Sequence, residues 1–155
     1  MSENYHHRMI DAFIGKPEKT LWYEMSFSKF NVNGVDLMKW NWNWWGFFGG
    51  FLFLLYRKQY LASALVFVTS MTVGMIPFMS LFIALFVGGY GTFFVYKGYK
   101  KKLAEIETTI EDEETRVQTM AEVAGYHQWV VWLYFVFMGL IMLGIFSALL
   151  IPTLS

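Results

Sequence analysis

The sequence predicts an all-α integral membrane protein, and the distribution of charge along the chain is the main reason. Residues 60–96 contain no Asp, Glu, Lys, Arg or His, and residues 129–152 form a second charge-free stretch. One helix needs roughly 20 residues to cross a bilayer core about 30 Å thick. The first stretch therefore suits two short helices joined by a turn, and the second suits a single spanning helix.

The composition favours the same class and a single domain. Of 155 residues, 56% are hydrophobic, 21% aromatic and 15% charged, whereas soluble domains have about 25% charged residues. Because 12 Lys and Arg balance 12 Asp and Glu, no nucleic-acid partner is expected. The absence of cysteine excludes disulfides, thiolate catalysis and cysteine-ligated metals. The N-terminal region lacks the apolar core of a signal peptide, so we expect internal segments to drive insertion.

Residues 1–39 form a polar region of mixed charge, which we assign to the cytoplasm. Gly15 and Pro17 predict a break between two short helices, because Gly commonly follows a helix and Pro suits the first helical turn. The run Asn-Val-Asn-Gly at residues 31–34 predicts a turn. The second helix is expected to present an apolar face made of Trp22, Tyr23, Phe27 and Phe30.

Residues 40–56 predict a short Trp-rich helix that is interfacial or re-entrant. Its wholly apolar part, residues 44–56, would be about 20 Å long as a helix, too short to span unaided. Trp44 and Trp45 are expected near the lipid headgroups, where Trp is enriched. The alternative is a full span beginning at Trp40. It is disfavoured because it would put the N-terminal bases and the bases that follow the segment on opposite sides of the membrane.

Residues 61–96 predict a transmembrane hairpin with arms at 61–76 and 79–96 and with Pro77 at the turn. Basic residues bracket the hairpin on both sides, which places both of its ends in the cytoplasm. Near a bilayer surface such residues can bind anionic headgroups, at about 1 kcal/mol each. The predicted headgroup contacts are Arg57, Lys58, Lys97, Lys100, Lys101 and Lys102.

Small residues in the apolar segments predict close helix packing, because they let two backbones approach each other within a membrane. The same spacing is common by chance in Gly-rich helices, and both interpretations stay open. The candidate packing residues are Gly46, Gly50, Ser70, Gly74, Ala84, Gly88, Gly91, Gly144 and Ala148.

Residues 98–127 predict one cytoplasmic amphipathic helix. Its apolar residues alternate at spacings of three and four, which is a heptad pattern interrupted at Glu113. Asp112 and Arg116 are expected to form a supporting pair. The apolar stripe either packs within the chain, lies on the membrane surface or contacts a second protein. Its candidate contact residues are Leu103, Ile106, Ile110, Val117 and Met120.

Residues 129–152 predict the third full span, with Trp129 and Trp132 at its cytoplasmic end. The resulting multi-pass topology has the N-terminus in the cytoplasm and the C-terminus outside.

Three short motifs follow one another through the first part of the chain. They are residues 12–16 (AFIGK) with 22–23 (WY), residues 41–49 (NWNWWGFFG) running into 54–60 (LLYRKQY), and residues 88–97 (GGYGTFFVYK). Together they resemble the HrgC-like family of small bacterial membrane proteins of unknown function, over roughly residues 12–105. Gly50 and Thr92 depart from the family pattern, which often has Pro and Asn there. The resemblance implies a bacterial source, for which we expect the inner membrane, and it supplies no catalytic residue or ligand.

Residues suited to chemistry are sparse. His6, His7 and Asp11 could bind a metal, but a solvated tail is the better interpretation. No metal, cofactor or catalytic site is therefore expected. The predicted spans contain no ionisable residue other than Tyr, which argues against a proton-coupled transporter.

We therefore expect a non-enzymatic membrane protein that is an accessory subunit or oligomeric scaffold of a membrane complex. Its expected partners are a bilayer with anionic headgroups and either further copies of the chain or a larger membrane protein. The alternative is a small oligomeric channel or carrier lined by the hydroxyl groups and glycines of the hairpin. A third interpretation is an enzyme that acts on lipid at the interface.

Overall fold

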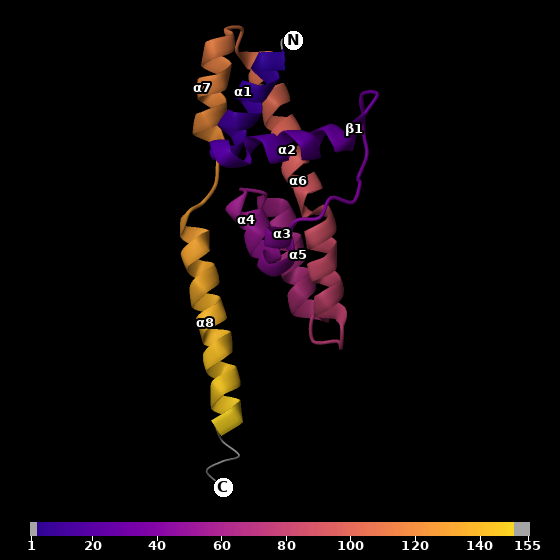
Figure 1. Ribbon diagram of the computed structural model, residues 1–155, viewed down its shortest axis with the longest axis vertical. Coiled ribbons are helices and arrows are strands. Elements are labelled where there is room, and N and C mark those ends of the chain that lie inside the picture. The colour runs from indigo at the N-terminus through magenta and orange to yellow at the C-terminus, as the bar shows by residue number, and fades with distance from the viewer. Residues whose placement is uncertain (1–2, 151–155) are drawn as a thin grey trace.

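The computed structural model describes residues 3–150, and it is mostly helical, as the sequence predicts. Its elements gather at two ends of the molecule (Figure 1), and the sequence of one end is polar and that of the other apolar. The polar end, called the head below, contains α1 (Glu3–Ile14), α2 (Pro17–Phe30), β1 (Asn31–Val32), β2 (Val35–Asp36), the C-terminal half of α6 (Met79–Thr109) and α7 (Glu113–Val123). The apolar end contains α3 (Trp44–Gly49), α4 (Phe51–Tyr56), α5 (Tyr60–Val73), the first half of α6 and α8 (Trp129–Leu150).

The head begins with two helices that meet at the predicted break. Gly15 has a φ of 65°, which favours glycine, and its N–H donates to the carbonyl of Asp11. Pro17 occupies the first turn of α2. After α2, β1 and β2 pair antiparallel around Asn33 and Gly34, whose positive φ values of 52° and 82° suit a tight hairpin turn.

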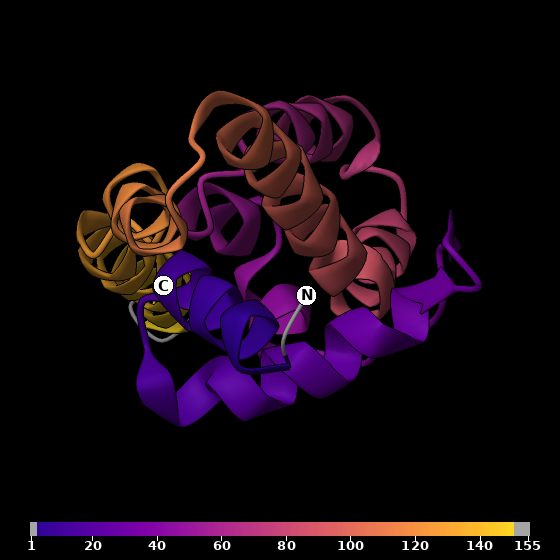
Figure 2. The ribbon, with the colours of Figure 1, turned by 90° about the horizontal axis from the view of Figure 1, so that it is seen from above.

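The core of the head is aromatic and lies between α1, α2, α6 and α7. Seen from above, α1 sits among the other three helices, all of which it contacts (Figure 2). The ring of Tyr99 on α6 lies 5.3 Å from Phe13 and 5.4 Å from Phe27, measured between ring centroids. Burial of such rings is the main stabilising contribution available to so small a domain.

The predicted single helix over residues 98–127 is wrong. α6 runs without interruption from the hairpin to Thr109, and α7 is a separate helix that folds back against it. The chain is extended at Ile110, and the carboxylate of Asp112 caps α7 by accepting from the N–H of Thr115 at 2.8 Å. Asp112 therefore starts a helix and does not pair with Arg116, which donates instead to the carbonyl of Ile110.

The apolar stripe is nevertheless covered, and the cover comes from the same chain. Ile106 and Met120 are buried in the head core, where α1 packs against α7. Leu103, Ile110 and Val117 are half-buried against the same cluster.

The apolar end departs from prediction in two respects. Residues 40–43 are not helical, and the segment 40–56 holds two short helices separated at Gly50. The hairpin forms, with its turn at residues 74–78, but α5 has only 14 residues. Among the described residues, two helices are long and apolar enough to cross a membrane, α6 and residues 129–149 of α8. The predicted count of three full spans is thus reduced to two candidates; residues 151–152 lie outside the described chain.

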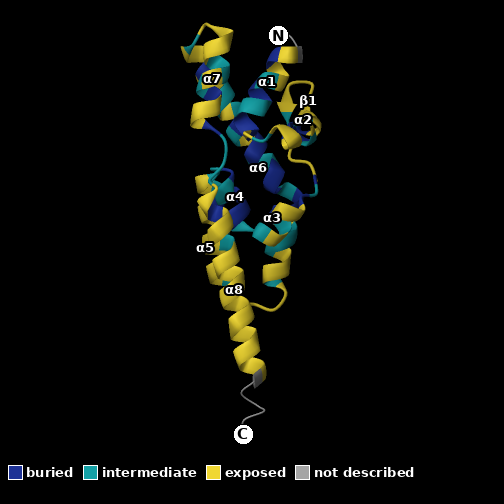
Figure 3. Cartoon of the chain, turned by 60° about the vertical axis from the view of Figure 1, so that its left-hand side comes forward, coloured by how far each residue is buried: buried dark blue, intermediate teal, exposed yellow. Residues whose placement is uncertain are grey.

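The two candidate spans differ in how they are packed. In the most apolar 18-residue stretch of each helix, 39% of α6 is buried within the chain, whereas only 6% of α8 is. α8 is exposed along most of its length and touches the rest of the chain mainly at α4 (Figure 3). The hairpin turn and the C-terminal end of α8 both point away from the head (Figure 1).

Candidate membrane-interface site

The junction between the head and the apolar end is built on two neighbouring glycines of α6. The backbone N–H groups of Asn41 and Asn43 donate to the carbonyls of Gly89 and Gly88, both at 2.8 Å. A Cβ added to Gly89 would lie 2.3 Å from the ring of Trp40. The missing side chains therefore let an extended segment run directly against a helix.

Two asparagine side chains fix this extended segment in place. Asn43 is buried, accepts from the N–H groups of Trp45 and Gly46, and donates to the hydroxyl of Thr92 at 3.2 Å. Asn41 is also buried, and its amide bonds to Ser26 and Lys29 of α2 at 3.2 and 3.1 Å. Sequence reasoning noted these residues only as part of a motif. The useful signal was an Asn directly before an apolar helix, which is a favoured N-cap.

Three of the predicted small residues meet where α3 and α4 pack on α6. A Cβ on Gly46 would lie 2.7 Å from the carbonyl oxygen of Val87, and one on Gly88 would lie 2.9 Å from Phe47. Gly91 lies against the ring of Phe53. Close backbone packing thus occurs here between elements of one chain.

The remaining small residues do other things. Gly50 has open space around it and a φ of 51°, so it is a bend between α3 and α4 and not a packing residue. Ser70 donates to the carbonyl of Val66 on its own helix, and Gly74 ends α5. Ala84 is half-buried, whereas Gly144 and Ala148 are exposed on α8. Gly98 was missed, although the side chain of Gln59 occupies the space of its absent Cβ.

Two predicted headgroup lysines cap the C-terminal end of α7. Lys102 donates to the carbonyl of Val123 at 2.6 Å, and Lys58 donates to that of Ala124. Positive charge is favourable there because the last carbonyls of a helix are unpaired and carry partial negative charge.

Two further predicted headgroup lysines bind a carboxylate in the head. Asp36 accepts from Lys97 at 3.2 Å, from Lys100 at 2.9 Å and from the hydroxyl of Tyr96 at 2.7 Å. The hydrogen bonds from Tyr96 and Lys100 lower the pKa of Asp36 from 3.8 to about 2. Lys101 remains exposed on the surface of α6.

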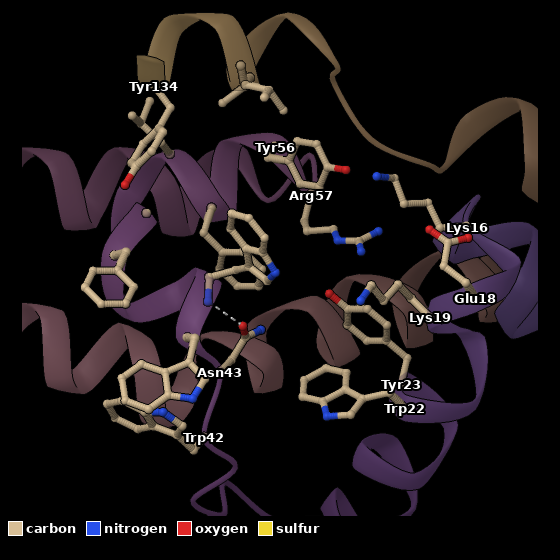
Figure 4. Close-up of a pocket in the computed structure, with 18 of the residues that line it drawn as sticks. Lys16, Glu18, Lys19, Trp22, Tyr23, Trp42, Asn43, Tyr56, Arg57 and Tyr134 are labelled. Atoms are coloured by element: carbon tan, nitrogen blue, oxygen red, sulfur yellow. Dashed lines mark hydrogen bonds between the residues drawn. The ribbon is translucent and has the colours of Figure 1, made fainter. Parts of the chain in front are cut away.

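A cavity of about 590 Å³ opens at this junction, between α2, α3, α4 and the start of α8. Its two ends differ in chemistry, as Figure 4 shows. Lys16, Glu18, Lys19 and Arg57 lie toward the head, and Trp42 and Tyr134 lie toward the apolar helices. The exposed Trp44 and Trp45, predicted to lie at the headgroups, also line it. The cavity is therefore amphipathic.

Arg57, a predicted headgroup contact, is buried inside the junction. Its exposed fraction is 6%, and its guanidinium sits over the rings of Tyr23 and Tyr56, at 4.7 and 5.3 Å. One terminal nitrogen donates to the carbonyl of Ile14 at 3.0 Å, while the Nε atom is buried without a hydrogen-bond partner. Burial raises the pKa of the Tyr23 hydroxyl, so it stays neutral beside this charge.

The histidines are engaged separately from one another. His7 contacts Glu24 at 3.0 Å and the ring of His127 bonds to the hydroxyl of Tyr60 at 2.6 Å, while His6 lies edge-on to Tyr99. Asp11 accepts from Thr20 at 2.5 Å. Among residues 4–149, no group of three His or acidic side chains lies close enough to hold a metal ion.

No family model, curated protein or solved structure matches this chain. The resemblance to the HrgC-like family consequently remains a prediction from short motifs.

Proposed function

We propose that this protein is a non-enzymatic accessory subunit or oligomeric scaffold of a membrane complex, located in a bacterial inner membrane with its head in the cytoplasm. The observation that carries the proposal is the isolation of α8. Only 6% of its most apolar 18-residue stretch is buried, so beyond its start this helix packs little against its own chain.

The composition of α8 supports a helix partner and not a simple lipid anchor. Gly139 and Gly144 each have open space where a Cβ would be. Together with Ala148, Gly144 forms a small-residue face that suits close approach of another helix.

The head supports a binding role more than a catalytic one. Its core is closed, while apolar side chains remain exposed on the outer face of α2 and on the segment after it. These are Leu21, Met25, Val35, Leu37 and Met38.

The channel alternative has less support, because four of the hairpin hydroxyls that would line a pore are already engaged within the chain. Ser63 donates to Phe51, Ser70 and Thr72 donate to carbonyls of their own helix, and Thr92 accepts from Asn43.

Photocrosslinking from α8 tests the accessory role. A photoreactive residue at position 144 should form a specific protein adduct in native membranes, at endogenous expression, whereas one at position 142 should label mainly lipid. Gly144→Leu should abolish the stoichiometric partner, or the homo-oligomer, on a native gel. Lipid adducts alone at both positions, with unchanged assembly of Gly144→Leu, would refute the proposal.

A further inference from the structure

The three cations that line the junction cavity form no ion pair with the described part of the chain. Within the described residues, no acidic oxygen lies within 4 Å of Lys16, Lys19 or Arg57. Lys16 faces only aromatic rings, with its ammonium 4.8 Å from the centroid of Tyr126. Lys16 is half-buried and Lys19 is exposed, whereas Arg57 is buried. The cavity therefore gathers three cations that an anionic occupant could pair with.

Arg57 brings a guanidinium group to the cavity lining. One terminal nitrogen donates to the carbonyl of Ile14 and the Nε atom is fully buried, so the second terminal nitrogen is the donor left for an occupant. Guanidinium groups bind phosphate through paired N–H donors, and they are favoured where recognition must be planar and partly desolvated.

The other end of the cavity suits a hydrocarbon chain. Phe48, Leu52, Val131 and Phe135 line it, and they belong to α3, α4 and the start of α8. This end continues onto the exposed apolar surface of α8, which has no charged residue over its whole length. A bound molecule could therefore extend from the charged end of the cavity along the apolar side chains of α4 and α8.

We propose that the cavity binds the phosphate of an anionic phospholipid, with Lys16 and Arg57 at the phosphate and one acyl chain in the part of the cavity that α4 and α8 line. The volume of about 590 Å³ is within the usual range for a small-molecule site. This inference rests on the membrane location proposed above and is independent of the accessory role.

Glu18 also lines the cavity and would repel the phosphate. With three cations against one carboxylate, the lining still carries an excess of positive charge. Glu18 then weakens binding, and its removal should strengthen it.

Native mass spectrometry of the full chain, released from nanodiscs with equal phosphatidylglycerol and phosphatidylcholine, measures the preference directly. The wild type should retain phosphatidylglycerol in excess. Lys16→Gln should lower the retained ratio about fivefold, the effect of one cation near a phosphate. Lys101→Gln removes an equal charge outside the cavity and should leave the ratio unchanged, whereas Glu18→Gln should raise it.

The test uses Lys16 because its side chain contacts aromatic rings and makes no hydrogen bond that the head needs. Arg57→Gln is less suitable, because it would also remove the hydrogen bond to the carbonyl of Ile14. Equal retention of the two lipids by the wild type would overturn the proposal. An equal fall for Lys16→Gln and Lys101→Gln would overturn it too, since the effect would then be general surface charge. Retention of inorganic phosphate in place of phospholipid, in lipid-free micelles, would show a free-anion site and overturn the lipid assignment.

Discussion

The side chain of Asn43 joins α3 to α6 by donating from its amide nitrogen to the hydroxyl of Thr92, 3.2 Å away. Both residues are buried, and they are 49 positions apart in the chain. The same Asn43 side chain caps α3. A single residue therefore starts α3 and fixes its position on α6, the longest helix.

Replacing Asn43 should weaken this junction. Asn43→Ala removes an N-cap, worth about 1 kcal/mol, and leaves the buried Thr92 hydroxyl with one partner fewer, which costs about 1 kcal/mol more. Thermal unfolding in mild detergent should report a loss of about 2 kcal/mol. Thr92→Val should cost less and should be non-additive with Asn43→Ala, whereas Thr69→Val on the exposed face of α5 should be neutral. Simple additivity would mean that the bond contributes nothing.

Replacing glycine by alanine should change the stability in opposite directions at two positions, Gly46 and Gly139. Gly46→Ala places its Cβ 2.7 Å from a backbone oxygen of α6, which cannot move aside without shifting the helix. Overpacking of this kind costs about 1–3 kcal/mol. Gly139→Ala has open space and should raise stability by up to about 1 kcal/mol through helix propensity. Melting temperatures that move in the same direction for both variants would contradict the packing described.

The C-terminal cap of α7 should depend on Lys102. Lys102→Gln removes a charged donor from the carbonyl of Val123, which should destabilise α7 by about 1 kcal/mol. Hydrogen exchange of the amides of residues 113–123 should become faster, while that of α1 changes less. Lys101→Gln is the matched control and should leave exchange unchanged. Protection that falls equally in both variants would point to net charge as the cause.

The carboxylate of Asp36 should make the attachment of the β1–β2 turn depend on pH. Its pKa falls from 3.8 to about 2 in the folded chain, so its contribution is present above the higher value and is lost as the pH falls toward the lower one. Asp36→Asn removes the effect. The stability difference between wild type and Asp36→Asn should therefore shrink from pH 5 to pH 2. A difference that stays constant over this interval would disprove the ion-pair role.

Charge distribution was sufficient to predict the helical class, the hairpin turn and the apolar C-terminal helix. The boundary between α6 and α7 was not predictable from hydrophobic spacing, because Leu103 to Met120 keep a heptad pattern across a break. The physical cause of the break is local. Asp112 caps the next helix, and Glu113 and Glu114 lie in its first turn, where negative charge is favoured.

The basic residues beside the apolar segments show a second limit of prediction from the sequence. Hydropathy places them beside apolar segments, and in a membrane protein such residues are expected to face headgroups. In the structure, Arg57, Lys102 and Lys58 instead donate to backbone carbonyls of distant elements, and Lys97 and Lys100 bind the carboxylate of Asp36. Such partners are set by the tertiary fold and leave no pattern in the local sequence.

The central claim is that the head lies on one side of a membrane and the hairpin turn on the other. The chain has no cysteine, so single-cysteine variants can be labelled selectively with a membrane-impermeant maleimide. Thr108→Cys and Ser28→Cys report on the head, and Met75→Cys reports on the turn, where the Met75 side chain is 92% exposed. In intact cells we expect labelling of Met75→Cys alone, with the two head sites labelled only after the membrane is permeabilised. Equal labelling of all three variants in intact cells would contradict the account.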